Sequence, residues 1–433
     1  MKLSIFQSAK GDCLLLEARD GTRMLCDGGM AASMRDYVRD ELAKLREAGQ
    51  RLDYVYVSHI DQDHISGALQ LLEDELEWRL FDYHEQQGTP IRKPKAPRPP
   101  EIGGVWHNAF RDQIGKNAGE VEDLLAAAAP PLLASAVPEI VALGEELQQI
   151  AVSIPEAIKV SRYASADLLD IPVNRLPGSH DAPKLLMVRD DQEAFAVGSM
   201  RLTIVGPTSE ELALLRDGWN TFLRGAKGKE QIKKLRAEIR RKIDAFGAER
   251  FDLRDWNGIE DYKGVTAPNI ASLMFMVEED GKRLLLTGDC QQDFILKGLK
   301  LTGFLDAGHL HIDVLKAQHH ASEHNFDDDF CRKVSADNYV FCGDGSNGNP
   351  ELSVIQMIYD SRLGPKAKRA LAPDAEGKPF KFWFSTASDM QAEGSPQREV
   401  FAKVEKLVAK LVTKSNGQLA AAFNDQASIT ITI

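Results

Sequence analysis

The segment SHIDQDH, residues 58–64, places four side chains that can bind metal ions within six positions: His59, Asp61, Asp63 and His64. Imidazole nitrogens and carboxylate oxygens both coordinate divalent cations, and alternate residues of a loop can face one point. Two ions could share such a set. The alternative is a solvated turn in which His and Asp occur together by coincidence, because short motifs are weak signals on their own.

Two later segments favour the metal site over the coincidental turn. LLLTGDC, residues 284–290, ends an apolar run with Asp289, and DVLKAQHHAS, residues 313–322, ends another with His319 and His320. A strand-end Asp often caps a turn, and adjacent histidines are usually surface residues. Because each group directly follows an apolar run, however, we expect these side chains to meet at one edge of a sheet.

The elements that must position these residues are read from hydrophobic periodicity. LDYVYVSH, residues 52–59, is typical of a buried strand, and ISGALQLLEDEL, residues 65–76, has helical spacing. The four residues would then occupy a loop between a strand end and a helix start, where rigid elements on both sides aim functional side chains. Upstream, residues 1–30 predict strand, turn and strand, and residues 31–49 predict an amphipathic helix closed by Gly49.

The rest of the chain predicts a single α/β domain over residues 1–433, organised as a sandwich with helical insertions. Short strands are expected within residues 101–110, 194–207, 269–289 and 380–386, and mainly helical insertions at about 109–170 and 209–262. A C-terminal α/β tail, about 351–433, would hold a helix at 351–362, a helix at 398–412 and a final strand pair around QLAAAF and ASITITI.

Composition limits the classes of protein to which the chain can belong. With 433 residues, 43% of them hydrophobic and 27% charged, it can bury a large core, as a soluble globular protein does. The longest low-charge stretch, residues 124–143, contains three prolines and Glu139, so no membrane span is expected. The amino terminus does not resemble a signal peptide, and a cytoplasmic location is expected.

Cysteine content and net charge limit the kinds of metal site, disulfide and nucleic-acid contact that can be expected. Five cysteines without a C-x-x-C pair argue against a disulfide framework and a zinc ribbon, so we expect reduced, buried thiols. A net charge of -12 disfavours indiscriminate binding of polyanions, so any contact with nucleic acid must be local. Residues 224–250 carry ten basic and four acidic residues and are a candidate patch, although an amphipathic helix is the favoured interpretation of this segment.

Together the segments resemble the metallo-β-lactamase superfamily in their order along the chain. They are GDCLLLEARDGTRMLCDGG, SHIDQDHISG, LTIVGP, NIASLMFMVEEDGKRLLLTGD, LKAQHHAS and GDGSNGNPE. The closest subgroup is the hydrolase domain of DNA-internalisation competence proteins and its stand-alone relatives, which has His-x-Asp-x-Asp-His where the wider superfamily has His-x-His-x-Asp-His. The resemblance covers roughly residues 1–70, 198–208 and 266–360.

The resemblance implies an αβ/βα sandwich, a site for one or two metal ions at the sheet edges, and hydrolysis by metal-activated water. It implies that His59 and Asp61 serve one ion, Asp63 and His64 the other, and Asp289 lies between them. In the HHAS segment it implies His320 as the ligand and His319 as a supporting residue or proton donor. Asp27 would orient ligands by hydrogen bonds, and Gly28 and Gly29 would permit a tight turn.

The chain departs from the family pattern at two positions and lacks one module. A third-motif histidine has no clear counterpart, and His107 and His180 are both candidates. A His-Pro pair is replaced by Asn349 and Pro350, and Asn349 could donate a hydrogen bond to a substrate oxygen but could not act as a general acid. The membrane channel of the competence protein is absent, so DNA import is not implied.

The expected function is metal-dependent hydrolysis, with a phosphodiesterase or nuclease as the leading form. Asp61 in place of a histidine hardens the site, so Zn²⁺ or Mn²⁺, as one or two ions, is expected. A nucleic acid or nucleotide would be the substrate. The sequence is compatible with a protein partner or with a homo-oligomer. Other interpretations are hydrolysis of a small ester, lactone, thioester or cyclic nucleotide, or a scaffold role in a multi-protein bacterial defence-type system.

Overall fold

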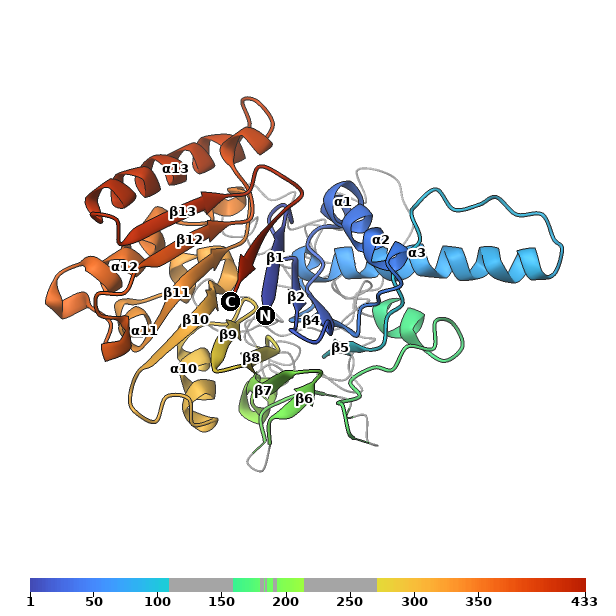
Figure 1. Ribbon diagram of the computed structural model, residues 1–433, viewed down its shortest axis with the longest axis horizontal. Helices are drawn as coiled ribbons and strands as arrows, with labels where there is room; N and C mark the ends of the chain where they lie inside the picture. The colour runs from blue at the N-terminus through green and yellow to red at the C-terminus, as the bar shows by residue number, and fades with distance from the viewer. Residues whose placement is uncertain (109–158, 180–182, 184, 190–192, 214–270) are drawn as a thin grey trace, which may run out of the picture.

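Two β-sheets packed face to face, with helices on both outer faces, form the body of the protein (Figure 1). The computed structural model describes residues 1–108, 159–179, 183, 185–189, 193–213 and 271–433. The insertions expected at about 109–170 and 209–262 lie mostly outside the described residues, as does the basic segment 224–250. Of the first insertion, residues 159–164 are helical.

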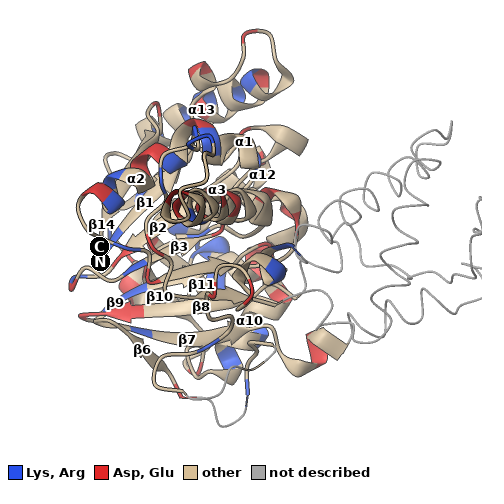
Figure 2. Ribbon diagram, turned by 90° about the vertical axis from the view of Figure 1, so that its right-hand side faces the viewer, with Lys and Arg blue, Asp and Glu red and all other residues tan. Residues whose placement is uncertain are grey.

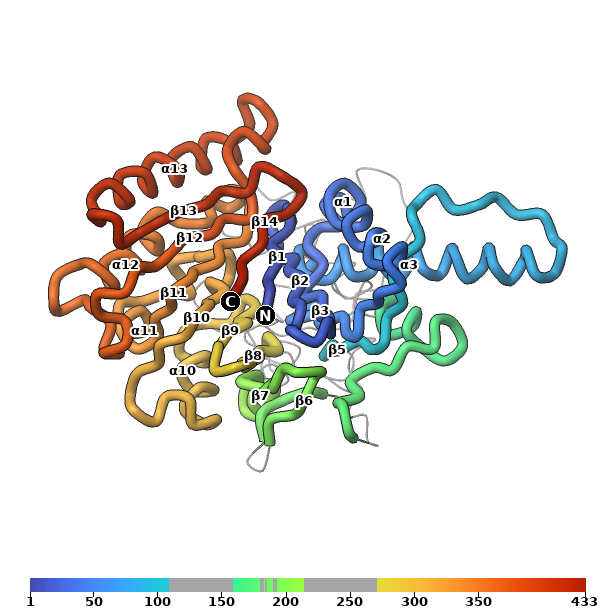
Figure 3. Tube along the Cα trace, viewed as in Figure 1, coloured from blue at the N-terminus to red at the C-terminus, as the bar shows by residue number. Residues whose placement is uncertain are grey.

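The first sheet has six strands in the order β14-β1-β2-β3-β4-β5. Their bounds are β1 (Lys2–Phe6), β2 (Leu14–Glu17), β3 (Arg23–Cys26), β4 (Tyr54–Val57), β5 (Val105–His107) and β14 (Ser428–Thr432). β3, β4 and β5 are parallel, whereas β1 pairs antiparallel with both β2 and β14. The two chain ends therefore lie side by side, as Figure 3 shows.

The second sheet has eight strands in the order β13-β12-β11-β10-β9-β8-β7-β6. Their bounds are β6 (Phe195–Val197), β7 (Met200–Gly206), β8 (Met274–Glu279), β9 (Lys282–Leu286), β10 (Leu310–Lys316), β11 (Val334–Phe341), β12 (Phe380–Phe384) and β13 (Leu419–Phe423). β6–β7 and β8–β9 are antiparallel hairpins, β7 also pairs antiparallel with β8, and β9 to β13 are parallel. The parallel strands consequently end at one edge.

Helices cover the outer face of each sheet. Over the first sheet lie α1 (Ala31–Ser33), a π-helical turn (Met34–Val38), α2 (Arg39–Glu47) and α3 (Gln62–Gln86). Over the second lie α10 (Gln292–Leu301), α11 (Asp328–Lys333), α12 (Leu352–Leu363) and α13 (Pro396–Lys414). Short 3₁₀ turns link them: η3 (Gln318–Ala321), η4 (Glu323–Asn325), η5 (Ser346–Gly348), η6 (Lys366–Lys368), η7 (Pro373–Ala375) and η8 (Ser388–Met390).

The layer between the sheets is a continuous apolar core built from both of them. Tyr56 and Trp106 of the first sheet contact Phe275 of the second, with ring centroids 5.0 Å and 5.5 Å from it. Separate apolar clusters lie between each sheet and its own helices. Because burial of apolar side chains is the main favourable term in folding, these three clusters define an αβ/βα sandwich, which confirms the predicted fold class.

One expectation about the C-terminal segment is wrong. The segments QLAAAF and ASITITI do not pair with each other, because β13 and β14 belong to different sheets. β13 extends the parallel sheet beside β12, and β14 pairs with β1, where Ser4 Oγ and Thr430 Oγ1 are 2.9 Å apart. β13 and β14 are therefore edge strands of different sheets.

The charged surface residues, the cysteines and the helix lengths can be compared with what the composition predicts. Acidic and basic residues are intermixed on α2, whereas α3 carries mainly acidic residues and α13 mainly basic ones (Figure 2). All five cysteines are buried and free, as expected. Among the described helices, none is long and apolar enough to cross a membrane.

Replacement of Phe384 tests the packing beneath α13. This buried ring stacks between Phe341 and Phe423, with centroid distances of 4.8 Å and 4.4 Å. Phe384→Ala leaves a cavity and should lower the free energy of unfolding by about 3–5 kcal/mol in urea denaturation. Leu301→Ala, at a side chain that is 57% exposed, is the control and should cost less than about 0.5 kcal/mol. Equal losses would contradict the described packing.

Candidate metal centre

The candidate metal-binding residues lie where strands of the two sheets end at a shared edge. His59 follows β4 of the first sheet, Asp289 follows β9 of the second, and His320 follows β10. Parallel strands aim the residues after their carboxyl ends into one crevice. The site therefore depends on the contact between the sheets, because each sheet supplies only part of it.

A carboxylate oxygen of Asp289 is the centre of the cluster. Its Oδ2 lies 3.1 Å from His320 Nε2, 3.2 Å from His64 Nε2 and 3.9 Å from His59 Nε2. Asp289, His64, His320 and Asp12 are all buried, with potential ligand atoms within 4.8 Å of one another. Three imidazole nitrogens and a carboxylate thus converge on one small volume.

The remaining predicted ligands flank this centre. Asp61 Oδ2 lies 3.6 Å from His59 Nε2, and Asp63 Oδ2 lies 3.4 Å from His320 Nε2. The structure therefore brings all six residues together. They do not all lie on a loop, however, because α3 begins at Gln62 and its first turn carries Asp63 and His64. That expectation was wrong, since Asp61 is already the residue before the helix and its carbonyl accepts from His64 N.

Several buried polar atoms of the cluster lack partners, which tests whether the residues fit a metal ion. Among the residues described, Nε2 of His59, His64 and His320 and Oδ1 of Asp61 are buried without a hydrogen-bond partner. Leaving such an atom unpaired costs about 1–3 kcal/mol, and native proteins rarely do so. A divalent cation held between these atoms and the carboxylates would satisfy them, so the residues fit a metal ion.

Asp27 holds one of the histidines in position, as the resemblance implies. Its Oδ2 accepts from His64 Nδ1 at 2.9 Å and from Ser58 Oγ at 2.7 Å, and its Oδ1 accepts from Ser58 N at 2.7 Å. His64 Nε2 is therefore the nitrogen that faces Asp289. Carboxylates that fix the second ring nitrogen of a histidine are common behind metal ligands.

The two glycines after Asp27 have different roles. A Cβ on Gly28 would lie 2.0 Å from Ala68 N, so the absent side chain allows α3 to approach the strand end closely. Gly29 has a φ of +64°, which permits the turn expected at this point. The start of α3, and with it Asp63 and His64, is placed by this contact.

Asp12 and Lys316 belong to the cluster but were missed in the sequence. Lys316 is buried, contacts Asp12 Oδ2, lies 3.5 Å from Asp289 Oδ1 and donates to the carbonyl of Gly288. Asp12 Oδ1 accepts from His320 Nδ1 at 3.1 Å. A charged residue at the end of an apolar strand was the available signal for Lys316, and the Gly-Asp pair before β2 was the signal for Asp12.

Charges within the cluster offset the cost of burying them. Burial lowers the pKa of His64 and of His320, but nearby carboxylates, Asp289 foremost, raise both well above the usual value. Burial raises the pKa of Asp12, but Lys316 and His320 more than offset this effect and lower it to about 2. Burial lowers the pKa of Lys316, but the carboxylates of Asp12 and Asp289 outweigh burial and raise it. The centre therefore combines anions with cationic neighbours, and a metal ion would compete with protons for the histidines.

His319 lies at the exposed side of the centre. Its side chain is 22% exposed against 6% for His320, and its Nε2 is 4.0 Å from Asp289 Oδ2. His319, His320 and Ala321 all have positive φ, at 46°, 52° and 64°. Such backbone is unfavourable for residues with side chains and concentrates at functional sites. The turn presents both rings toward Asp289 from adjacent positions.

The other sequence candidates are placed less directly. Asn349 is buried on the loop after β11. Gly343 of the same loop lies between Asn349 and His320, because a Cβ on Gly343 would be 3.2 Å from His320 Cβ and 3.7 Å from Asn349 O. The catalytic role of Asn349 stays a prediction. His107, opposite Val57 in the β4–β5 pair, is buried outside the four-residue group, and burial lowers its pKa to about 4. His180 lies outside the described residues.

Residues 9–75 match the model of the metallo-beta-lactamase superfamily. This match supports the resemblance to the metallo-β-lactamase superfamily that the motifs indicate. The matched stretch contains Asp12, Asp27 and the whole SHIDQDH segment, whereas Asp289 and the two histidines after β10 lie beyond it. No curated protein matches the chain.

The solved structures to which the chain is similar are distant from it in sequence and in structure. A mutant of the CmlA beta-hydroxylase is 11% identical over 99% of this chain, which spans only 54% of that protein, with a TM-score of 0.33. Zn²⁺-bound PqqB from Methylobacterium extorquens is 12% identical over 100% of both chains, with a TM-score of 0.33. Unliganded yeast PDE1 is 9% identical over 100% of this chain and 99% of that one, with a TM-score of 0.37. None of these likenesses bears on activity.

Loss of the buried lysine should be costly in the protein without metal. Lys316→Met leaves the carboxylates of Asp12 and Asp289 buried without their cation, and should lower the free energy of unfolding by about 3–5 kcal/mol in chelator. Saturating Zn²⁺ should reduce this loss, because the ion supplies the missing positive charge.

The matched control is Lys282→Met. Its ammonium is exposed and pairs with Asp313 at 2.8 Å, so the change should cost less than about 1 kcal/mol. A Lys316→Met protein as stable in chelator as this control would contradict the described ion pair.

Proposed function

We propose that the protein is a metal-dependent hydrolase that cleaves phosphodiesters in a nucleic acid or nucleotide. The observation that carries the proposal is the convergence of three imidazole nitrogens without hydrogen-bond partners on Asp289 Oδ2, among the residues described. A purely structural ion would be enclosed by its ligands. Here Asp63 and His319 remain partly exposed beside the centre, which leaves an approach for substrate.

The proposed ligands divide between two neighbouring positions. His59 and Asp61 would hold one Zn²⁺ or Mn²⁺ ion, and Asp63, His64 and His320 a second, with Asp289 between them. The chemistry that such ions supply is a lowered pKa for a coordinated water molecule and neutralisation of charge on a phosphoryl oxygen. A ligand set rich in carboxylates suits hard ions and charged oxygen substrates.

Asp63 is the proposed acceptor of a hydrogen bond from the attacking water. Burial raises its pKa, but His320, whose Nε2 lies 3.4 Å from Asp63 Oδ2, and the charge of His64 outweigh burial and hold the pKa well below its usual value. The carboxylate is therefore ionised at neutral pH. The side chain of Asp63 is 16% exposed, whereas that of Asp289 is 3% exposed. Of these two carboxylates, Asp63 is therefore the one that an incoming water can reach.

His319 is the proposed site of proton transfer at Nε2. Asn325 Nδ2 donates to the carbonyls of Asp289 and Cys290, so its Oδ1 is left as an acceptor for His319 Nδ1 at 2.6 Å. The neutral ring then carries its proton on Nδ1 and accepts at Nε2. Burial lowers the pKa of His319, which favours this neutral form. The ring is thereby set to accept a proton near the exposed side of the centre.

The phosphodiester assignment also draws on the motif. His-x-Asp-x-Asp-His at residues 59–64 is the form found in the hydrolase domain of DNA-internalisation competence proteins, and paired ions suit in-line displacement at phosphorus. A cytoplasmic location and a nucleic acid or nucleotide partner are part of the proposal. Turnover of single-stranded DNA, cyclic dinucleotides and a generic ester across Zn²⁺, Mn²⁺ and Mg²⁺ separates it from hydrolysis of esters.

Asp63→Asn is the sharpest test of the assigned roles. The amide keeps the size of the side chain but loses the charge that would bind metal and accept from water, so phosphodiesterase activity should fall about 100-fold. The control is Asp36→Asn on the exposed side of its helix, which should retain activity. If Asp63→Asn kept the activity of the unaltered protein with a normal melting profile, the assignment would be wrong.

A further inference from the structure

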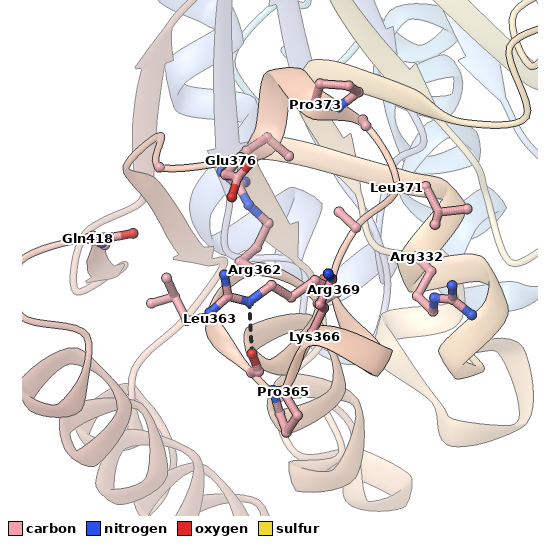
Figure 4. Close-up of a pocket in the computed structure, with 16 residues that line it drawn as sticks. Arg332, Arg362, Leu363, Pro365, Lys366, Arg369, Leu371, Pro373, Glu376 and Gln418 are labelled. Atoms are coloured by element: carbon pink, nitrogen blue, oxygen red, sulfur yellow. Dashed lines mark hydrogen bonds between the residues drawn. The ribbon is translucent and has the colours of Figure 1, made fainter.

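A second site lies in a pocket of about 1010 Å³ beneath the end of α12 (Figure 4). It is formed by the last residues of α12, the turns η6 and η7 that follow, the end of α11 and the residue before β13. Figure 4 shows Arg362 and Arg369 near the centre of the lining, with Arg332 and Gln418 toward opposite ends. The described parts of the metal centre contribute no residue to it.

The length of β11 separates the pocket from the metal centre. Arg332 lies just before the start of this strand, and Gly343, which is close to His320, lies just after its end. Eight residues of strand span roughly 26 Å at about 3.3 Å per residue. A ligand in the pocket therefore cannot touch the reacting groups at the metal centre.

The lining is strongly positive. Four basic residues and one carboxylate, that of Glu376, line the pocket, which gives an excess of three positive charges in a chain of net charge -12. Three of the basic side chains have no salt bridge within the part of the chain that the structure describes: Arg332, Lys366 and Arg369. Their cationic charge is available to a bound anion.

Neighbouring lysines outside the pocket contrast with these residues. Lys333, next to Arg332, pairs with Asp329 at 2.6 Å, and Lys368, next to Arg369, pairs with Asp328 at 3.4 Å. Neither of these lysines lines the pocket. Lys333 and Lys368 are therefore paired, whereas Arg332, Lys366 and Arg369, which line the pocket, have no salt bridge among the described residues.

Arg362 forms the fixed part of the lining. Its terminal nitrogens donate to the carbonyls of Ala336, Ala375 and Lys378, and its guanidinium lies 4.7 Å from the ring centre of Phe380. Its buried Nε has no hydrogen-bond partner among the residues described, and the same is true of Arg332 Nε. Both guanidinium groups thus retain an uncommitted donor, which is unfavourable when buried.

The end of α12 does not cancel this positive charge. A helix C-terminus carries partial negative charge on its free carbonyls. Here the carbonyl of Ser361 accepts from Ala370 N at 2.7 Å, and that of Gly364 accepts from Arg369 Nε at 2.9 Å. Arg369 keeps its terminal nitrogens for another acceptor after making this bond.

We propose that this pocket binds a small organic phosphate of nucleotide size. Guanidinium groups match the geometry of phosphate oxygens, and the volume lies at the upper end of the range for small-molecule sites. Leu371, which is 43% exposed, lies with Pro365 and Pro373 on the lining and supplies apolar surface for the organic part. The proposal does not rest on the proposed hydrolase activity, because its ligand binds at a separate place.

Calorimetric titration of the full chain in chelator tests the pocket without interference from a loaded metal centre. The probes are AMP, inorganic phosphate and adenosine, and the carboxylates of the metal-free centre repel the two anions. The pocket variant is Arg332→Gln with Arg369→Gln, and the control is Lys333→Gln with Lys368→Gln. Both variants remove two positive charges from the same region, but only the pocket variant removes side chains that line the pocket.

We expect saturable binding of AMP to the unaltered protein, tighter than that of inorganic phosphate or adenosine. The pocket variant should bind AMP about tenfold more weakly for each arginine removed, since hydrogen bonds to charged groups are lost. The control variant should lose less than about threefold. If the pocket variant melts at a markedly lower temperature, Lys366→Gln, at an exposed side chain, replaces it.

Three outcomes would overturn the proposal. The first is a dissociation constant for AMP weaker than about 1 mM in the unaltered protein. The second is an equal loss in the pocket and control variants, which would mean that only the general field of the region attracts anions. The third is equal affinity for AMP and for either adenosine or inorganic phosphate, which would remove the phosphate or the organic part from the recognition. Each outcome is independent of whether the protein hydrolyses phosphodiesters.

Discussion

The structure depends on the burial of the Asp289 carboxylate between two sheets. This anion is surrounded by the imidazoles of His64 and His320 and by the ammonium of Lys316, each within 3.5 Å. An isolated buried carboxylate would be prohibitively unfavourable, so these neighbours are required for the strand end to remain where it is. Because His64 lies on α3, which covers the first sheet, and Lys316 lies on β10 of the second, the full set of cationic neighbours is assembled only when the sheets are docked.

Apolar packing and a few hydrogen bonds set that docking. Ser58 O accepts from Leu273 N at 2.7 Å, and Tyr56 Oη donates to the carbonyl of Leu273, so β4 is tied to the start of β8 next to the site. At the opposite side of the centre, the three left-handed residues 319–321 are held by bonds from Ser322 N to His319 O and from Glu351 N to Ala321 O. Strained backbone of this kind persists only where its surroundings fix it.

The sequence predicted the six candidate ligands and the sandwich because both leave local signals. Asp289 and His320 follow apolar strands directly, and hydrophobic periodicity marks most of the strands, although α10, α11 and β11 were not predicted. What it could not predict were pairings across long stretches of chain. Asp12 and Lys316 are 304 residues apart by their numbers, and each is an ordinary charged residue until the sheets meet. The pairing of β14 with β1 is likewise a contact between chain ends, and His319 acquires its tautomer only through Asn325.

Metal uptake by the chelator-stripped protein tests the central claim most directly. Equilibrium dialysis against Zn²⁺ and against Mn²⁺, followed by elemental analysis, should give about one to two ions per chain. His64→Ala should lose most of this uptake, because it removes a nitrogen that faces Asp289 Oδ2 at 3.2 Å. Absence of uptake of Zn²⁺, Mn²⁺, iron or Ni²⁺ by the folded protein would contradict the account, as would uptake that His64→Ala leaves unchanged.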